Sequence, residues 1–533
     1  MRRLTGPALL LLAGVLYAAV TAACGNGGDG DDGSSPRTIP AGSGTPQTSC
    51  VTDLAQGGAD THIYGRYTVD YLADRFSLAS GDFNADGYDD ALVGAPLADG
   101  QDNSRVNSGE VYVIFGSDSL PKTVDVGQGA EFTIYGEAPQ DNFGLSVAAA
   151  DVNGDSIDDI VSGARFASYQ ERAQVGKTYV IFGRRGLAGV IDLAKGEQDA
   201  TIVGKDAADF SGVLVAASNV TGDETADVMI GAIAATGPDG GRPRAGEVYV
   251  VPGSRDLRGT IDLSKQAPEF TVFGAHSEDS LPNRIATGDV NGDGRQELVL
   301  GAPYADGGEA DRLDAGEAYI VPVPEGGGSL DLLSGQGFTR IRGAKSRDGL
   351  GHFTAAGDVN GDGISDAIIG ARDADGPQDS RNNAGEVHVL FGRPDLPPSA
   401  DLAVDELDLA IIGANEGDSL GFTVAAADLN GDGTDDILAG APLGDSCANG
   451  RPEGGEAYVI FGHDDLGGLI DLATDEPDLS LFGEEAADEL GFSLAAGDFN
   501  GNGKQDLIAG ALLADGPDNA RADAGEAYII ISR

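Results

Sequence analysis

Residues 358–366 read DVNGDGISD, with oxygen-bearing side chains at the first, third, fifth and ninth positions and glycine at the fourth and sixth. Related nine-residue stretches begin at Asp82, Asp151, Asn219, Asp289, Asp428 and Asp498, so seven copies recur at steps of 68–70 residues. A fixed period of this length indicates a repeat fold, in which each copy belongs to one supersecondary unit that packs against its neighbours.

The segments around each copy predict short strands. A run of small residues precedes the stretch, as in FGLSVAAA (143–150), and an apolar run ending in Gly-Ala follows it, as in ALVGAP (91–96). Segments such as GEVYVIFG (109–116) and FTIYG (132–136) come next. β-Branched and aromatic runs bounded by Gly, Asp and Asn, without helical periodicity, are typical of strands. We therefore expect four strands per repeat.

Seven four-stranded units predict an all-β fold, a seven-bladed β-propeller, in which small sheets stand radially around a channel. A linear array of sheets is the alternative, but a ring gives every sheet a neighbour on both apolar faces. GEAYIIIS (525–532) reads as the third strand of the last repeat, and no fourth strand follows it. THIYG (61–65) resembles the fourth strands elsewhere, so we expect it to complete the seventh blade and close the ring.

The N-terminal segment MRRLTGPALLLLAGVLYAAVTAAC has two arginines, a short apolar run and small residues up to Cys24, the pattern of an export signal. The small residues resemble a bacterial lipobox, although Thr21 stands where leucine is usual. We expect a signal peptide over 1–23, a lipidated Cys24 and flexible tether over 24–58, and the propeller over 59–533. The protein would then be an exported lipoprotein of the cell surface or outer membrane; secretion without a lipid is the alternative.

The chain has 33 Lys and Arg against 87 Asp and Glu, a formal net charge of -54. Such a surface repels nucleic acid and anionic lipid heads, so we expect no nucleic-acid partner and contact with a membrane only through the lipid anchor. The acidity suits cation binding, and we expect a monomer. In an exported chain, Cys50 and Cys447 either form a disulfide or remain free thiols.

These motifs resemble those of a known family. Phe-Gly before the nine-residue stretch, the stretch itself and Gly-Ala-Pro after it are similar to the FG-GAP repeats of the integrin α-chain β-propeller, over roughly residues 60–533. Individual copies drift: the fourth repeat has LPNRIATGD (281–289) in place of Phe-Gly, and Gly-Ala-Pro becomes Gly-Ala-Arg at 163–165 and 370–372. The resemblance implies calcium in the loops and a binding surface on the opposite face of the ring.

Carboxylate and amide oxygens at alternating positions of a tight loop suit calcium, a hard cation that takes several oxygen ligands. The seventh residue would add its backbone carbonyl, which leaves its side chain free to vary, and glycine at the sixth position permits the turn. The stretch matches half of an EF-hand loop, but Val93 stands at the twelfth position of the first copy, where that loop needs glutamate. A metal-free turn rich in Asp and Asn is the alternative.

Six copies carry the expected calcium ligands at their first, third, fifth, seventh and ninth positions. These residues are Asp82, Asn84, Asp86, Tyr88, Asp90, Asp151, Asn153, Asp155, Ile157, Asp159, Asp289, Asn291, Asp293, Arg295, Glu297, Asp358, Asn360, Asp362, Ile364, Asp366, Asp428, Asn430, Asp432, Thr434, Asp436, Asp498, Asn500, Asn502, Lys504 and Asp506. The copy at Asn219 has neutral Asn219 and Thr221, and we expect it to bind weakly or stay empty. About six calcium ions would thus stabilise the fold.

No arrangement of residues indicates catalysis. The five histidines, His62, His276, His352, His388 and His463, are scattered, and neither a GxSxG nor an HExxH motif occurs. We therefore predict no catalytic residue and no enzyme. Acidic residues are so numerous that a glycosidase-like carboxylate pair can be neither located nor ruled out from the sequence.

Four of the loops between the expected second and third strands have an arginine midway: Arg105, Arg312, Arg381 and Arg521. These arginines either face a ligand or pair within their own loops, with Asp99, Asp306, Asp375 and Asp515. The close repetition favours pairing, because binding more often uses what differs between blades. Loop 166–177 does differ: it ends in Lys177, where the other copies have glutamate.

A calcium-stabilised binding or adhesion module for an unknown protein or glycan is the predicted function. The alternatives are a calcium-dependent, glycan-active enzyme on a propeller scaffold and a purely structural component of the cell envelope. A pocket that gathers acidic and aromatic residues on the face opposite the calcium loops would favour the enzyme.

Overall fold

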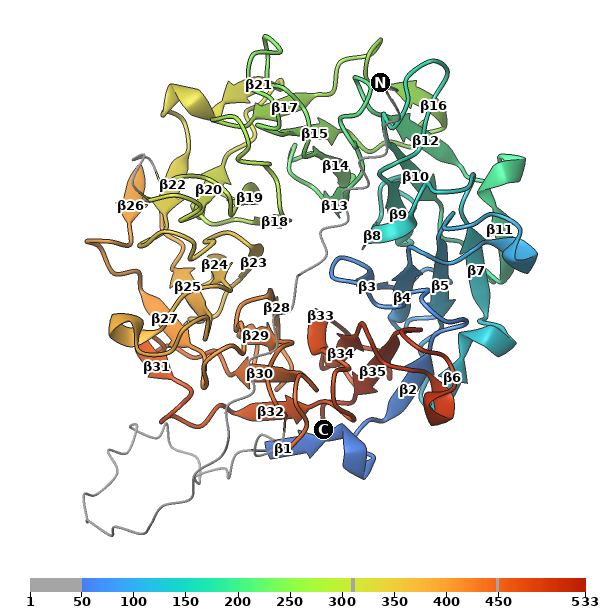
Figure 1. The fold of residues 1–533 in the computed structure, drawn as a ribbon. Coiled ribbons are helices and arrows are strands. Elements are labelled where there is room, and N and C mark those ends of the chain that lie inside the picture. Colours follow the sequence, from blue (N-terminus) through green and yellow to red (C-terminus); the bar gives the residue numbers. More distant parts are fainter. Residues whose placement is uncertain (1–49, 308–311, 447–449) are drawn as a thin grey trace, which may run out of the picture. The chain divides into compact units, whose positions relative to one another are not determined.

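Seven five-stranded sheets, the blades, stand around a common centre in the computed structural model of this chain (Figure 1). The structure describes residues 50–307, 312–446 and 450–533, which fall in one compact unit, Ser49–Arg533. The expected signal peptide, Cys24 and Cys447 lie outside the described residues, so lipidation stays a prediction and the choice between a disulfide and free thiols stays open. No helix in the described part of the chain is long and apolar enough to cross a membrane.

Four antiparallel strands form the body of each blade, and each set below runs from blade 1 to blade 7. The innermost strands are β3 (Leu78–Gly81), β8 (Phe143–Ala150), β13 (Leu214–Ser218), β18 (Ile285–Gly288), β23 (Phe353–Gly357), β28 (Thr423–Ala427) and β33 (Leu490–Gly497). The second strands are β4 (Asp90–Ala95), β9 (Asp159–Ala164), β14 (Asp227–Ala232), β19 (Glu297–Ala302), β24 (Asp366–Ala371), β29 (Asp436–Ala441) and β34 (Asp506–Ala511). The third strands are β5 (Glu110–Ile114), β10 (Lys177–Ile181), β15 (Glu247–Val251), β20 (Glu317–Val321), β25 (Glu386–Leu390), β30 (Glu456–Ile460) and β35 (Glu526–Ile530). The fourth strands are β7 (Phe132–Tyr135), β12 (Ala200–Val203), β17 (Phe270–Phe273), β22 (Thr339–Arg342), β27 (Leu409–Ile412), β32 (Leu479–Phe482) and β2 (Thr61–Tyr64).

A fifth, outermost strand corrects the expectation of four strands per blade. It is parallel to the fourth strand and comes from the next repeat, from the connection between that repeat's third and fourth strands. For blades 1 to 7 these strands are β11 (Gly189–Asp192), β16 (Gly259–Asp262), β21 (Gly328–Asp331), β26 (Ser399–Asp401), β31 (Gly468–Asp471), β1 (Cys50–Asp53) and β6 (Thr123–Asp125). Each connection therefore pairs with the preceding blade, which covers that blade's edge.

The N-terminal segment closes the ring with two strands. As expected, β2 completes blade 7: it pairs antiparallel with β35, with Thr61 opposite Ile529. In addition, β1 pairs parallel with β32 and becomes the fifth strand of blade 6. Residues 50–56, which fall inside the expected tether, thus form β1 and a 3-10 turn, and only the segment before them is without a described structure.

Short 3-10 turns are the remaining regular elements. After fifth strands lie η1 (Leu54–Gln56), η3 (Val126–Gln128), η4 (Leu193–Lys195) and η5 (Leu332–Ser334). In the loops between second and third strands lie η2 (Gln101–Asn103), η6 (Pro377–Asp379) and η8 (Pro517–Asn519).

Apolar side chains fill the spaces between neighbouring blades. Between blades 1 and 2, for example, Val111 and Val113 pack with Ile160 and Ile181, all essentially without exposure. Burial of such a side chain contributes about 1.5–3 kcal/mol. The Gly-Ala pair at the end of each second strand serves this packing: a Cβ on Gly163 would lie 1.8 Å from the carbonyl oxygen of Gly212 in the next blade. The repeat keeps glycine there because the backbones of adjacent blades touch.

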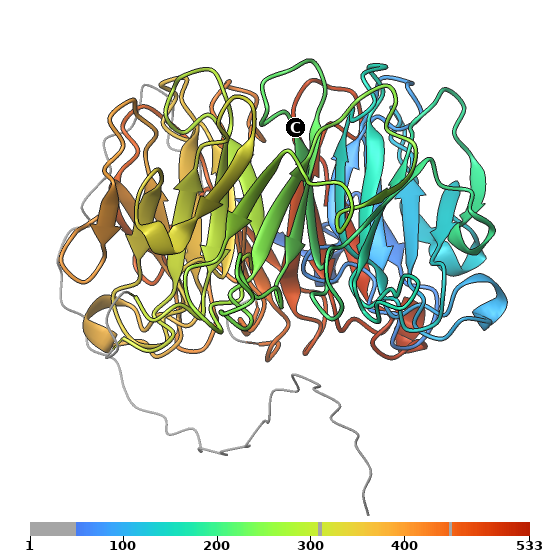
Figure 2. The ribbon, with the colours of Figure 1, turned by 90° about the horizontal axis from the view of Figure 1, so that it is seen from above.

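The loops gather at the two ends of the ring (Figure 2). Because the four strands alternate in direction, the loops between first and second strands all lie on one end, which we call the lower face. The loops between second and third strands, and those from each fourth strand to the next blade, lie on the opposite end, the upper face. The nine-residue stretches are the lower-face loops.

Candidate functional site

The first carboxylate closes each lower-face loop. Asp82 accepts hydrogen bonds from the backbone N–H of Asp86 (3.1 Å) and of Gly87 (2.9 Å), and Asp86 accepts one from Tyr88 N–H (3.1 Å). The same two bonds to the first carboxylate recur in the loops at Asp151, Asp289, Asp358, Asp428 and Asp498. The backbone therefore wraps around these side chains, as it does in metal loops and in Asx turns alike.

The ninth carboxylate is buried and anchors the loop. Asp90 accepts hydrogen bonds from the backbone N–H of Phe83 (3.1 Å) and of Gly116 (3.0 Å), which lies just after the third strand. Burial, together with the nearby Asp86 and Asp82 and against the backbone hydrogen bonds, raises its pKa to about 8. The pKa of the ninth residue is also raised in the other loops, to about 8 in Asp159, about 7 in Glu297, Asp366 and Asp436, and about 6 in Asp506.

The chemistry of this donor set fits calcium. Every side chain at the first, third, fifth and ninth positions offers oxygen, and a buried ninth carboxylate beside two others has no ion-pair partner among the described residues. A divalent cation would offset that repulsion. The carboxylates of one loop are not drawn together, however. Among the described residues, one group of three His, Cys, Asp or Glu side chains has all its ligand atoms within 4.8 Å of one another. This group is His62, Glu484 and Glu526, and it does not belong to a lower-face loop. Amide and backbone oxygens would therefore have to share the coordination.

The loop at Asn219 is built differently. The Asn219 amide donates to the carbonyl of Asp223 and accepts from Gly222 N–H (2.7 Å), so neutral groups occupy the place of the first carboxylate. This geometry agrees with the expectation of weak or no binding there, which stays a prediction.

Neighbouring lower-face loops are linked by the residue at the eighth position. Asp158 of blade 2 accepts a hydrogen bond from Asp82 N–H of blade 1 (3.1 Å), and Asp435 of blade 6 accepts one from Asp358 N–H of blade 5 (3.0 Å). Asp89 makes the corresponding bond to Asp498 N–H (2.8 Å) between blades 1 and 7. These bonds join the lower-face loops of adjacent blades directly.

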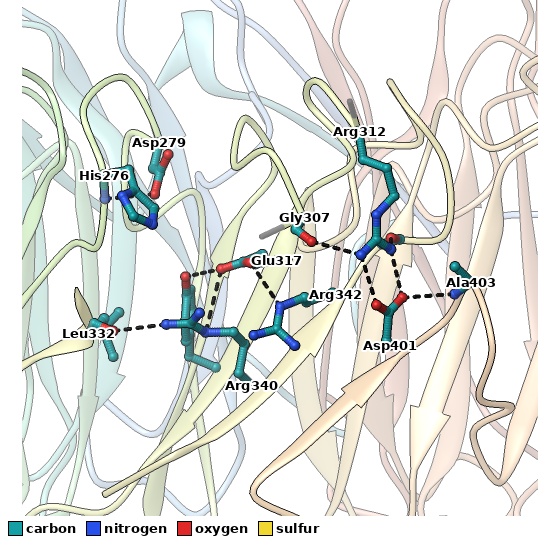
Figure 3. Close-up of polar contacts among 12 residues, drawn as sticks. His276, Asp279, Gly307, Arg312, Glu317, Leu332, Arg340, Arg342, Asp401 and Ala403 are labelled. Carbon is teal, nitrogen blue, oxygen red and sulfur yellow. Dashed lines mark hydrogen bonds and ion pairs between the residues drawn. The ribbon is translucent and has the colours of Figure 1, made fainter. Parts of the chain in front are cut away.

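On the upper face, the loop arginines hold the fifth strands. Arg312 donates from Nη1 and Nη2 to the two carboxylate oxygens of Asp401 (2.6 and 2.8 Å), at the end of the fifth strand of its own blade (Figure 3). The corresponding pairs are Arg105–Asp192, Arg172–Asp262, Arg242–Asp331, Arg381–Asp471, Arg451–Asp53 and Arg521–Asp125. We call these seven pairs the clasps.

The clasps correct the expected pairing within each loop. Asp99 and Asp375 accept backbone N–H groups of their own loops, from Asn107 and Asn383 (2.9 Å each), instead of an arginine. The arginines are bound by carboxylates and are therefore not free to face a ligand. Sequence reasoning missed Arg172, Arg242 and Arg451, although in all seven repeats the arginine stands five residues before the first residue of the third strand.

Beneath each clasp, the first residue of the third strand is a glutamate in six blades, buried in five of them and partly exposed at Glu386. Tyr112 Oη donates to Glu110 (2.5 Å), and Tyr249 and Tyr528 make the same bond to Glu247 and Glu526. Figure 3 shows the version in blade 4, where Arg340 and Arg342 reach Glu317. In blade 7, His62 stands at the position that corresponds to Arg340 of blade 4, and its Nε2 lies 2.5 Å from Glu526. The His62 group thus repeats the contact that Arg340 makes with Glu317 in blade 4.

In blade 2 the two charges of this arrangement are reversed, because Lys177 stands where the other blades have glutamate and its partner is the carboxylate of Glu137. The Lys177 Nζ lies 2.5 Å from Glu137, and Tyr179 donates to the same Glu137 carboxylate. In blade 1 the corresponding residues are Arg66 and Glu110, with Nη1 and Oε2 3.2 Å apart. The unusual lysine singled out from the sequence therefore preserves an ion pair.

Two cavities open on the upper face. One, of about 250 Å³, lies among the starts of the innermost strands and is lined by residues such as Arg75, Phe76 and Arg165. The other, of about 620 Å³, is lined by residues that include Tyr304, Asp314, His352, Arg372 and Asp373. Nine large apolar side chains are strongly exposed in the described residues. None of them lies on the lower face, and five lie on the upper face: Tyr67, Val69, Val106, Tyr304 and Leu313. The others, Val190, Leu333, Val404 and Leu469, lie on the outer rim.

Comparison with known proteins identifies the repeat. A family model described as "FG-GAP repeat" matches residues 76–114, 143–181, 281–321, 350–390, 420–460 and 490–530. The third blade, which contains the divergent Asn219 loop, is outside these matches.

The curated relatives are longer proteins. "Phosphatidylinositol-glycan-specific phospholipase D" of Bos taurus is 27% identical over 407 residues, covering 73% of this chain and 45% of the relative. "Integrin alpha-PS2" of Drosophila melanogaster is 27% identical over 276 residues, covering 49% and 18%. "Integrin alpha pat-2" of Caenorhabditis elegans is 30% identical over 248 residues, covering 45% and 19%. The chain thus spans less than half the length of each.

Among solved structures, the chain is similar to "Crystal structure of BBS1N in complex with ARL6DN, soaked with lead". The TM-score is 0.43 at 8% identity, covering 88% of this chain and 98% of that one. A likeness this distant supports no functional inference.

Proposed function

Because this chain is an FG-GAP repeat β-propeller similar to integrin α chains, we propose that it is an exported, calcium-stabilised binding module, anchored through a lipidated Cys24. The proposed ligand is a protein or glycan outside the cell, bound on the upper face. About six lower-face loops would hold calcium and stiffen the ring from the opposite end.

The observation that carries this proposal is the contrast between the two faces. The lower face has the acidic loops and none of the strongly exposed large apolar side chains among the described residues. The upper face has five such side chains and the two cavities described above. Apolar and aromatic side chains beside a cavity are typical of a recognition surface, because they lose water when a ligand covers them.

For calcium, the first, third, fifth and ninth side chains of a loop and the seventh carbonyl would hold the ion. The ion's charge would offset the repulsion among the carboxylates, and its binding only to the folded loop would stabilise the ring by mass action. The chain's own residues pre-organise the loop through the hydrogen bonds to the first carboxylate.

Binding can be tested on the intact calcium-loaded chain with arrays of glycans and extracellular proteins. Tyr304→Ala removes a 48% exposed ring at the larger cavity, and Val190→Ser removes a 52% exposed side chain on the outer rim as the matched control. We expect a ligand whose affinity falls at least about tenfold with Tyr304→Ala and is unchanged by Val190→Ser. A ligand that responds equally to both substitutions, or no ligand at all, would contradict the proposal.

The glycan-active enzyme is a second candidate. The larger cavity brings together Tyr304, Asp314, Asp373 and Asp375, which is the combination of acidic and aromatic residues that this function would need. One matched relative is also named as a phospholipase. Incubation of the chain with the array glycans, followed by mass spectrometry, distinguishes turnover from binding, and Asp373→Asn should abolish any turnover by this cavity.

A further inference from the structure

Four arginines surround the centre of the upper face, although the chain as a whole is strongly acidic. Arg75 and Arg284 lie at or just before the innermost strands of blades 1 and 4, and Arg165 and Arg372 follow the second strands of blades 2 and 5. The last two replace the proline of Gly-Ala-Pro. All four are partly buried, with some exposure left.

Contacts across the ring hold this cluster together. The rings of Phe76 in blade 1 and Phe353 in blade 5 stack at 5.8 Å, although these blades are not neighbours. Arg75 Nη1 lies 2.9 Å and Arg372 Nη1 3.3 Å from the same Nε2 of the buried His352. Since that nitrogen must accept from the guanidinium groups, His352 is neutral. Burial lowers its pKa well below the usual range, and Arg372 and Arg75 lower it further.

Carboxylates do not balance these charges. Arg372 Nε lies 3.2 Å from Asp373, and Asp74 accepts a hydrogen bond from the backbone N–H of Arg75 (2.6 Å). Among the described residues, no carboxylate or other acceptor contacts the Arg284 guanidinium, which lies over the rings of Phe353 (4.7 Å) and Phe76 (5.9 Å). The buried Nε atoms of Arg284 and Arg165 have no hydrogen-bond partner. Four guanidinium groups thus face two carboxylates.

Burial lowers the pKa of these arginines. Burial and the nearby Arg372, opposed by Asp74, together lower the pKa of Arg75 to about 10. Burial alone lowers the pKa of Arg284 to about 10. The clasp arginines of the same face, by contrast, each have an aspartate partner. In the described part of the chain, Arg284 and Arg165 form no such ion pair, and Arg165 borders the cavity of about 250 Å³ together with Arg75.

We propose that this central cavity binds an organic oxyanion, a carboxylate or phosphate group carried on a small apolar body. Arg75 and Arg165 line this cavity together with the Asp74 carboxylate, and their guanidinium groups supply paired N–H donors that match the oxygens of such a group. Phe76, Leu145, Val213 and Phe492 line the same cavity and would contact the apolar body. The site deepens the proposed binding function, on which it rests, by naming the ligand chemistry at the centre of the upper face.

Calorimetric titration of the intact calcium-loaded chain tests the site. The probes are benzoate and phenyl phosphate, with inorganic phosphate as the bare anion and benzyl alcohol as the neutral body, at constant ionic strength. We expect binding of benzoate or phenyl phosphate, weaker binding of inorganic phosphate and none of benzyl alcohol. Equal binding of inorganic and phenyl phosphate would overturn the organic ligand class, and no binding of any anion would overturn the site.

Two variants locate the binding. Arg165→Pro restores the Gly-Ala-Pro of other repeats and is therefore expected to fold, and Arg284→Met removes the unpaired guanidinium. Each should weaken benzoate or phenyl phosphate at least tenfold, while Arg185→Met, at an exposed position, should have no effect. Anion affinity unchanged in both variants, Arg165→Pro in the cavity wall and Arg284→Met beside it, would place binding elsewhere and overturn the proposal. If the anions fail to bind while an array ligand still responds to Tyr304→Ala, only this inference falls and the binding function stands.

Discussion

Arg521, in the last blade, donates from its two terminal nitrogens to both carboxylate oxygens of Asp125 (2.7 and 2.8 Å), which belongs to the first repeat. The pair lies at the seam where the two ends of the propeller meet. Hydrogen bonds from Arg521, together with other donors, keep the pKa of Asp125 below its usual value despite burial. Arg451 makes the second clasp of the seam, to Asp53 in β1 (2.7 Å).

Arg521→Met should weaken the seam. The substitution removes two charge-assisted hydrogen bonds and leaves Asp125 largely buried without its partner, which costs about 1–3 kcal/mol. Because β2 and β6 then lose an anchor, limited proteolysis should cut the N-terminal segment faster than in the wild type. Chemical denaturation measures the change in the free energy of unfolding.

Arg312→Met is the matched control for the seam. It breaks an equivalent clasp inside the ring, to Asp401, and should cost a similar free energy without faster release of the N-terminal segment. Identical cleavage patterns in the two variants would show that the seam clasp has no special role in closure.

The exchanged charges of blade 2 allow a rescue experiment. Lys177→Glu should place a second carboxylate, at a buried position, against the partly exposed Glu137 and lower stability by about 1–3 kcal/mol. Adding Glu137→Arg recreates the Arg66–Glu110 pair of blade 1 and should recover most of the loss. A double-mutant cycle on thermal unfolding measures the coupling; additive effects would mean that the two side chains do not act as a pair.

The pH dependence of stability should separate two glutamates at equivalent positions. Burial, together with the nearby Asp418 and Asp445 and against the hydrogen bond from Tyr458, raises the pKa of Glu456 to about 7. Its folded pKa lies above the unfolded one, so its contribution to stability is full below about pH 4.5 and is lost as the pH rises through about 7. Glu456→Gln should therefore flatten the fall in stability between pH 5 and pH 8.

Glu386→Gln should behave in the opposite way. Burial would raise the pKa of Glu386, but the hydrogen bond from His388, at 3.0 Å, and the charges of His388, Lys345 and Arg381 together keep the pKa below the usual value. Its ionised form thus stabilises the fold above the unfolded pKa, and this contribution is lost as the pH falls. The variant should be less stable than the wild type at pH 7, and the same profile for both variants would contradict this assignment.

The sequence predicted the ring and its closure because each repeat has the same order of short apolar runs, and THIYG (61–65) matched the missing fourth strand. The fifth strands were not predicted because they are three or four residues long and half exposed, as Val190 in β11 shows. A signal was present, since VTDLAQG (51–57) repeats the pattern of VIDLAKG (190–196).

The partners of the upper-face arginines could not be found by proximity in sequence. Arg312 and Asp401 are 89 residues apart, and they meet only because the fifth strand comes from the next repeat. The nearer Asp306 instead accepts the backbone N–H of Asp314. The central arginines likewise come from four different blades, so only the closed ring brings them together.

Calcium content and thermal unfolding of the intact chain, measured together, test the lower-face loops most directly. After dialysis against micromolar calcium, elemental analysis should find about six ions per chain, and a chelator should lower the unfolding midpoint by many degrees. Asp358→Ala should remove one ion. No bound calcium, with the same midpoint in calcium and in chelator, would show that these loops are metal-free Asx turns.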